Sequence, residues 1–191
     1  MNNVLKQLQE RNSAPRLIDP APSGDVLESM FAAALRAPDH AWLQPWRFLV
    51  IDGESRQQLG ELFKQALLRK TPDADQAAQD KAANAPQRAP LLVVVVCRYT
   101  EHPKVPAHEQ LLSAGCAAHG LLLAAEAQGF AGVWRTGWVA EDDYIASELG
   151  LAANEEIIGF LYFGSRDGRA KSLPERKVEN YVSEWTGRAA Q

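Results

Sequence analysis

The sequence is poor in cysteine and carries no surplus of positive charge. Cys97 and Cys116 are the two cysteines in 191 residues, and they form no Cys-x-x-Cys pair. Cysteine this sparse argues against a disulfide framework. Lys and Arg together number 20 against 24 Asp and Glu, a net charge of −4 at pH 7. A basic field is therefore lacking, and we expect no nucleic-acid partner.

Long apolar runs are missing too. The chain has no run of about 18 apolar residues, the length that a membrane-spanning helix needs, and its first residues contain no apolar signal core. We therefore expect no membrane partner and a cytoplasmic protein. With 191 residues and 46% hydrophobic composition, the chain suits one globular domain, which we place at residues 1–191.

Common signatures of nucleotide and hydrolase sites are absent as well. The chain has no Gly-x-Gly-x-x-Gly after a strand, no Walker loop and no Gly-x-Ser-x-Gly elbow. Asp142 and Asp143 are adjacent at a predicted helix start, so we interpret them as capping groups. The four histidines lack metal-ligand spacing, so we predict no metal site and interpret His119 as a core histidine.

The apolar pattern predicts helices that separate a few short strands. Continuous β-branched residues at 91–97 are typical of a central strand buried on both faces. Thr71 and Pro72 resemble a helix start, and the polar helix after them is either a solvated surface helix or a lid. Strands are expected at 46–51, 91–97, 130–136 and 157–164, and helices at 3–10, 23–36, 55–69, 72–85, 106–128 and 142–149. This order is no regular βαβ alternation, so it favours an α+β layered fold.

The segment from Ser113 to Gly137 organises the predicted fold. Its first part is an alanine-rich helix with almost no charge between Glu109 and Glu126. A helix that is apolar on every side is a buried helix. Its small side chains would let neighbouring elements approach closely, including a second copy of the helix in a dimer. Gly129 is expected to end it.

Two polar clusters are candidate ligand sites. Trp134, Arg135 and Thr136 end the glycine-rich strand and offer a ring edge, a cation, a hydroxyl and backbone amides. The alternative is an ordinary strand with an exposed arginine. The segment 11–16 sets two arginines around Asn and Ser, which could grip an anion. The alternative there is a solvated helix end.

Segments in the same order along residues 3–166 together resemble the FMN-dependent nitroreductase family. The segment 11–13 is similar to the family's Arg-Arg-Ser start, and 38–46 to its Pro-Ser-x-x-Asn-x-Gln-Pro-Trp motif. The small-residue helix followed by 128–136 is like its helix–glycine–strand unit, and 158–164 matches its last core strand. The second segment keeps four family residues: Pro38, Gln44, Pro45 and Trp46. The short length is most similar to the minimal-size branch.

The resemblance implies an intertwined α+β homodimer with FMN at its interface. A central mixed or antiparallel sheet of about four or five strands would be surrounded by helices, with residues 165–191 as an arm that packs on the partner. One subunit would bind the phosphate and ribityl chain with Arg11, Asn12 and Ser13, and the ring edge with Trp134, Arg135 and Thr136. Arg36 and His40 would come from the partner. The flavin carries the chemistry, so no side chain is expected to be catalytic.

The implied activity is that of an oxidoreductase. FMN would take hydride from NADH or NADPH and reduce a small oxidised acceptor, such as a nitroaromatic or a quinone. Arg169 or Lys171 is a further candidate for the phosphate, Arg36 or Arg16 for the negative charge at N1, and a Trp134–Arg135 backbone amide for N5. The alternatives are a flavin- or small-molecule-binding homodimer without turnover, acting as a carrier or sensor, and a purely structural homodimer.

Departures from the family pattern modify these expectations. Asn12 replaces the usual second arginine, and Trp42 replaces an asparagine. Asp39 replaces a serine and would place an unfavourable negative charge near a reduced flavin unless it pairs with Arg36.

Overall fold

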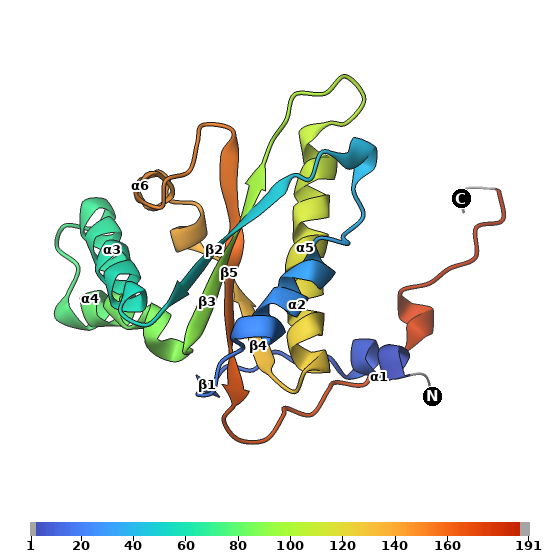
Figure 1. Cartoon of the computed structure of the whole chain (residues 1–191), viewed down its shortest axis with the longest axis horizontal. Coiled ribbons are helices and arrows are strands. Elements are labelled where there is room, and N and C mark those ends of the chain that lie inside the picture. Colours follow the sequence, from blue (N-terminus) through green and yellow to red (C-terminus); the bar gives the residue numbers. More distant parts are fainter. Residues whose placement is uncertain (1–2, 188–191) are drawn as a thin grey trace.

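A computed structural model describes residues 3–187, so both ends of the expected domain 1–191, and the last residues of the expected arm, lie outside the described residues. It contains a five-stranded sheet in which every pairing is antiparallel (Figure 1). Strand β5 (Glu155–Arg166) is the longest. It pairs with β3 (Leu91–Arg98) and β4 (Ala131–Arg135) and, near its end, with β1 (Leu17–Ile18). The strands are β1 (Leu17–Ile18), β2 (Trp46–Asp52), β3 (Leu91–Arg98), β4 (Ala131–Arg135) and β5 (Glu155–Arg166).

Helices cover both faces of this sheet (Figure 1). The described helices are α1 (Asn3–Glu10), α2 (Gly24–Ala34), α3 (Ser55–Lys70), α4 (Gln76–Ala83), α5 (Ala107–Ala127) and α6 (Asp143–Glu148). The central strand β3 divides its side chains between the two layers. Leu92, Val94 and Val96 belong to the core shared with α3, and the odd-numbered residues from Leu91 to Cys97 to the core shared with α2 and α5. The predicted α+β fold and the strand buried on both faces are confirmed.

One predicted helix start is wrong. The helix after Pro72 begins four residues later, because Asp75 is its N-cap and accepts a hydrogen bond from the Ala78 amide at 2.8 Å. This α4 packs against α3. At Gly60 an added Cβ would lie 2.1 Å from the Ala83 carbonyl oxygen, so glycine permits the close approach. By contrast, Asp142 caps α6 as expected and accepts from the Ile145 amide at 3.0 Å.

The interpretation of α5 as buried all round holds for only part of its surface. Ala114, Ala117, Ala118 and Leu121 are completely buried. On another side the helix is bare, because Leu112 is 65% exposed and both Cys116 and His119 are exposed. His119 is therefore not a core histidine. Periodicity could not reveal this face, because apolar residues line it as well.

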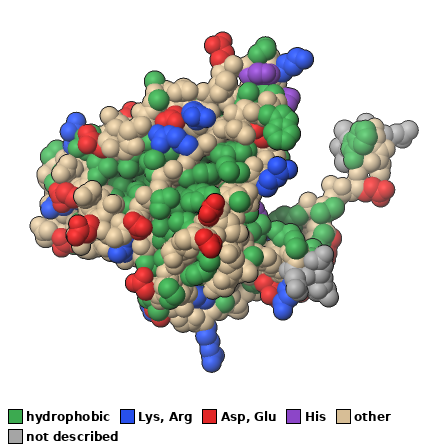
Figure 2. All heavy atoms as spheres, viewed as in Figure 1, with side chains coloured by type: hydrophobic (Ala, Val, Ile, Leu, Met, Phe, Trp, Pro, Cys, Tyr) green, Lys and Arg blue, Asp and Glu red, His purple; other side chains and the backbone are tan. Residues whose placement is uncertain are grey.

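The chain after β5 leaves the body of the molecule. Residues 167–187 contain only a short 3-10 turn at Val178–Asn180. Hydrogen bonds tie Asp167 and Lys171 to the segment after α1, and the chain beyond them runs away from the main body (Figures 1 and 2). Several of their apolar side chains are exposed: Leu173, Val178, Tyr181, Val182 and Trp185. Within the described range, none of the helices is long and apolar enough to cross a membrane.

Candidate functional site

The two polar clusters predicted from the sequence lie side by side. The Ala14 amide donates to the Gly132 carbonyl at 3.0 Å, which ties the segment after α1 to strand β4. Ala14 is fully buried, so this attachment is part of the core. Arg11 precedes it, and its guanidinium lies 3.5 Å from the Ser13 hydroxyl. The Arg11 guanidinium and the Ser13 hydroxyl are thus held beside β4, although more than 100 residues separate this segment from the strand in sequence.

Asn12 anchors this segment to other elements. Its amide donates to a Glu126 carboxylate oxygen at 3.3 Å, and its side-chain amide donates to the Lys171 carbonyl at 2.6 Å. Arg166 donates through Nη2 to the Asn12 carbonyl at 2.9 Å. Arg166 is a second guanidinium at this place that the sequence analysis did not single out. The sequence could have indicated Arg166 as a site residue, because it is a basic residue at the end of the last core strand.

Trp134 and Arg135 point to opposite faces of the sheet. The Trp134 indole lies on the α5 side, where Nε1 donates to the Ile158 carbonyl at 3.3 Å. Gly159 makes room for it, since a Cβ there would lie 2.2 Å from Nε1. On the α3 side, Arg135 lies over the Tyr162 ring, 5.4 Å from its centroid. The side chains of the predicted ring-edge cluster are therefore divided between two layers.

One side of the β4 backbone pairs with β5, and the other side faces the Arg11 segment. Gly132 directs its carbonyl to Ala14 rather than to β5, whereas the Arg135 carbonyl lies toward Gly159 of β5. Alternate residues of a strand direct their N–H and C=O groups to the same side. Trp134 therefore shares the orientation of Gly132, and its peptide groups point off the sheet edge. The backbone amides of Trp134 and Arg135 are the candidates from the sequence for a contact with the flavin N5 atom. Of these two amides, the one of Trp134 faces outward.

A groove of about 730 Å³ runs between α2, α5 and the ends of β4 and β5. Arg36 and Trp134 both line it within one chain, together with Leu112, Cys116 and His119 from the bare side of α5. The groove is large enough for a drug-sized ligand, for which pockets of about 300–1,000 Å³ are usual. Arg36 is exposed and reaches this groove from the end of α2.

The loop that contains His40 has an unusual backbone. Ala41, Trp42 and Gln44 have positive φ values of 64°, 56° and 49°, a region that non-glycine residues rarely adopt. Asp39 holds the loop, since it accepts from the Gln44 amide at 2.7 Å. Among the described residues it makes no ion pair with Arg36, so the pairing considered from the sequence does not occur in this chain.

His40 and Trp42 are both exposed on this loop. His40 lies 2.7 Å from a Glu109 carboxylate oxygen through Nδ1, which ties the loop to the start of α5. Trp42 is 78% exposed. Strain of this kind concentrates at functional segments, and here it presents a large ring to solvent. Within one chain, His40 does not join Arg11 or Trp134.

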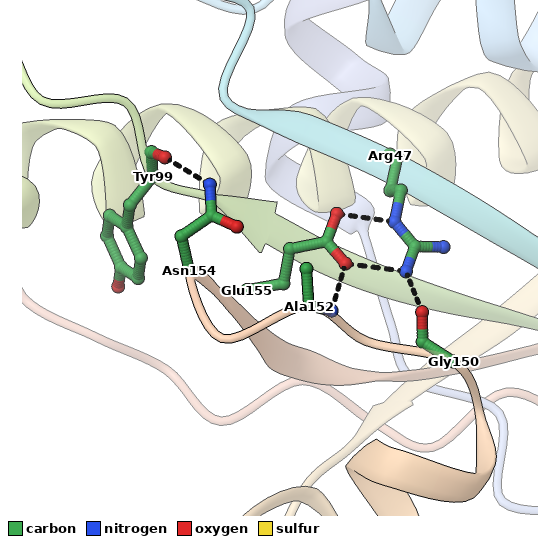
Figure 3. Close-up of polar contacts among 6 residues, drawn as sticks. All are labelled: Arg47, Tyr99, Gly150, Ala152, Asn154 and Glu155. Atoms are coloured by element: carbon green, nitrogen blue, oxygen red, sulfur yellow. Dashed lines mark hydrogen bonds and ion pairs between the residues drawn. The ribbon is translucent and has the colours of Figure 1, made fainter.

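An ion pair braces the strand on which Trp134 rests. Arg47 contacts both carboxylate oxygens of Glu155, at 2.6 and 2.7 Å, and donates to the Gly150 carbonyl at 3.2 Å (Figure 3). The hydrogen bonds from Arg47 are the main reason why the pKa of Glu155 lies below its usual value. Asn154 fixes the same turn through the Tyr99 carbonyl, at 2.7 Å (Figure 3). The start of β5 is thus held rigidly under the candidate site.

The buried cysteine does not supply a reactive thiol. Burial raises the pKa of the Cys97 thiol to about 11, so it stays protonated at neutral pH. Cys116 is exposed on α5. In residues 3–187, no group of three His, Cys, Asp or Glu side chains could hold a metal ion.

Comparison with known proteins relates the chain to one family. A sequence model described as "Nitroreductase family" matches residues 9–165. "Putative NAD(P)H nitroreductase YdjA" of Escherichia coli K12 is 42% identical over 170 residues, which cover 89% of this chain and 92% of that protein. "Putative NAD(P)H nitroreductase" of Haemophilus influenzae is 38% identical over 177 residues, 92% of this chain and 94% of that protein.

Solved structures agree with the fold. The nitroreductase-like family protein from Bacillus cereus superposes with a TM-score of 0.82 at 20% identity, over 98% of both chains. A nitroreductase with bound FMN from Bacteroides fragilis gives a TM-score of 0.73 at 20% identity, over 97% of this chain and all of that one. The resemblance stated from the sequence is therefore confirmed: this chain belongs to the nitroreductase family.

Proposed function

We propose that the chain is an FMN-dependent oxidoreductase that takes hydride from NADH or NADPH and reduces a small oxidised acceptor, such as a nitroaromatic or a quinone. The pairing of Ala14 with Gly132 carries this proposal, because it sets Arg11 and Ser13 beside the outward peptide groups of β4. The relatives named NAD(P)H nitroreductases support it as well.

The residues at this place fit FMN. Arg11 and Arg166 supply two guanidinium groups around the segment 11–13, and guanidinium pairs phosphate well. We assign Arg11, Asn12, Ser13 and Arg166 to the phosphate and ribityl chain. The outward Trp134 amide suits a ring nitrogen, and Trp134, Arg135 and Thr136 would lie along the ring edge. FMN supplies the redox chemistry when bound, and the protein binds it, orients it and excludes water.

The functional unit is proposed to be a homodimer. Each chain leaves apolar surface uncovered at three places, namely the bare side of α5, the Trp42 loop and the tail after β5. Trp42, Leu112 and Trp185 are 78%, 65% and 86% exposed. A second copy would cover such surface. In this arrangement the tail packs on the partner, and Arg36 and His40 complete the partner's flavin site. A cytoplasmic location stays a prediction.

A visible absorption spectrum of the purified protein tests this function directly. The expected result is a flavin spectrum that bleaches with NADH or NADPH in the absence of oxygen and returns when a nitroaromatic or a quinone is added. A flavin spectrum that neither nucleotide bleaches would favour a carrier or sensor. A colourless protein that takes up no added FMN would contradict the proposal and leave a structural dimer.

A further inference from the structure

A second cavity lies on the face of the sheet opposite the groove. It has a volume of about 320 Å³ and is enclosed by α3, α4, the end of β4 and the turn after it. Its apolar wall includes Phe160, Tyr162 and Trp138, so it is suited to a flat aromatic group. The resemblance assigned nothing to this cavity, and the polar helix α4 that borders it was interpreted only as a solvated helix or a lid.

Three cations line this cavity, and no acidic side chain does. They are Lys81 on α4, Arg88 before β3 and Arg135 at the end of β4. Across residues 3–187 the ion pairs are His40–Glu109 and Arg47–Glu155, so none of the three has a carboxylate partner. In a chain of net charge −4, an unpaired cluster of cations is a local reversal of charge that favours an anion.

Arg135 ties the cation cluster to the aromatic wall of the cavity. Its Nε atom is buried and has no hydrogen-bond partner in the described structure. A buried donor without a partner is destabilising, and such groups are rare in native proteins. Arg135 lies over the Tyr162 ring. Burial raises the pKa of Tyr162, and the nearby charges of Arg135 and Arg88 oppose this rise.

The cavity adjoins the proposed flavin site. Arg135 and Thr136 line it and also belong to the segment assigned to the ring edge. One end of the cavity therefore borders the segment assigned to the ring edge, and Lys81 and Arg88 also line the cavity.

We propose that this cavity binds the carboxylate end of an aromatic acid and thereby selects anionic aromatic electron acceptors, an inference that rests on the proposed function. Lys81 and Arg88 would pair with the carboxylate. The ring would pack between Phe160 and Trp138.

For a nitroaromatic acid, hydride from NAD(P)H and one proton convert the nitro group to a nitroso group. Two electrons are transferred and one water is released.

The kinetic test compares two acceptors of the same shape, 4-nitrobenzoate and 4-nitrobenzamide. The wild-type enzyme is expected to have a lower KM for the acid. In Arg88→Gln and Lys81→Gln, the ratio of the KM for the acid to the KM for the amide should rise about tenfold, which corresponds to the loss of one charge-assisted contact. Lys70→Gln is the matched control, because Lys70 is an exposed cation on α3 that does not line the cavity. Its ratio should equal that of the wild type.

A binding measurement separates this inference from the proposed function. Calorimetric titration of the FMN-loaded protein with benzoate needs no turnover, and Arg88→Gln should weaken the binding about tenfold relative to Lys70→Gln. If NAD(P)H is not oxidised, the proposed function fails while the titration still decides the inference. Equal affinities of the protein for benzoate and benzamide would overturn the inference that the cavity binds a carboxylate. Loss of FMN from Arg88→Gln and Lys81→Gln would also overturn it, since the cavity would then belong to the flavin.

Discussion

At the residue scale, Arg11 is the side chain on which the flavin assignment depends most. It lies beside the Ser13 hydroxyl, on a segment that is fixed to β4 and held further by Arg166 and Glu126 through Asn12. The substitution of Asn12 for the family's second arginine removes one cation. Arg166 supplies a guanidinium at the same place, so under the proposed function it would offer the phosphate a second cation.

Replacing Arg11 tests this assignment. In Arg11→Ala we expect the Kd for FMN to rise on the order of tenfold or more, because a charge-assisted contact to the phosphate is lost. Fluorescence titration of the apoprotein with FMN measures the change. Lys104→Ala, at an exposed loop cation far along the chain, should bind FMN like the wild type. Unchanged binding by Arg11→Ala would remove Arg11 from the phosphate site.

The Arg47–Glu155 pair makes a pH-dependent contribution to stability. The pKa of Glu155 is lower in the folded chain, so its contribution is fully present above the ordinary value of 4.5 and is lost as the pH falls below it. We expect Glu155→Gln to reduce the free energy of unfolding by about 1.5–3 kcal/mol at pH 7. Urea unfolding of both proteins at several pH values should show this difference shrinking in acid. A difference that stays constant down to pH values well below 4.5 would contradict the assignment.

At the element scale, the contact between β4 and β5 places the predicted ring-edge segment. The sequence indicated the β4 strand from its bracketing glycines, and the structure shows why one further glycine matters. Gly159 has a φ of +155° and lies directly under the Trp134 indole. The two-residue strand β1 could not be predicted, because two residues show no alternation of polar and apolar side chains.

Adding a methyl group at Gly159 tests the packing of this element. In Gly159→Ala the new Cβ would lie 2.2 Å from the indole Nε1 and 2.9 Å from the Arg135 carbonyl oxygen, at a φ of +155° that alanine rarely adopts. Both Trp134 and the backbone must therefore move, at a cost of about 1–3 kcal/mol. Gly115→Ala is the control, because its Cβ would meet the same indole at an ordinary 3.9 Å. Chemical unfolding should therefore separate the two variants, and equal midpoints would show that the indole is not fixed by this contact.

At the scale of the whole molecule, the uncovered apolar surface is the main unexplained feature of a single chain. The bare side of α5, the strained loop at Ala41–Gln44 and the tail after β5 all lack a covering within the described residues. The proposed dimer accounts for all three. It also accounts for His40, which in one chain contacts Glu109 and does not join the other predicted site residues.

Mixing two defective chains tests whether each flavin site draws on both subunits. Arg11→Ala and His40→Ala homodimers should both bind FMN weakly. Co-expressed heterodimers should regain one intact site per dimer, because both substitutions then fall in the other site. Flavin content of the isolated heterodimer, measured by absorbance, gives the result. Heterodimers without any tightly bound flavin would contradict the shared site.

A single substitution on α5 tests the dimer itself. Leu112→Glu places a charge on the bare side of the helix, where burial of an unpaired carboxylate is unfavourable. We expect light scattering to show a monomer, with the fold kept because Leu112 is exposed in the single chain. Glu141→Gln, at an exposed position away from α5, is the control. A Leu112→Glu protein with the mass of the wild type would place any interface elsewhere.

The local pattern of residues was enough to predict the helices, the buried strand at 91–97, the α+β class and the family. These depend on periodicity, capping and short motifs, which are properties of neighbouring residues. The tertiary structure alone decided that Ala14 pairs with Gly132, that Trp134 and Arg135 face opposite layers, and that Arg166 joins the Arg11 segment. It also decided that α5 has a bare side. These facts depend on contacts between residues far apart in the chain, and no local pattern encodes which distant groups will meet.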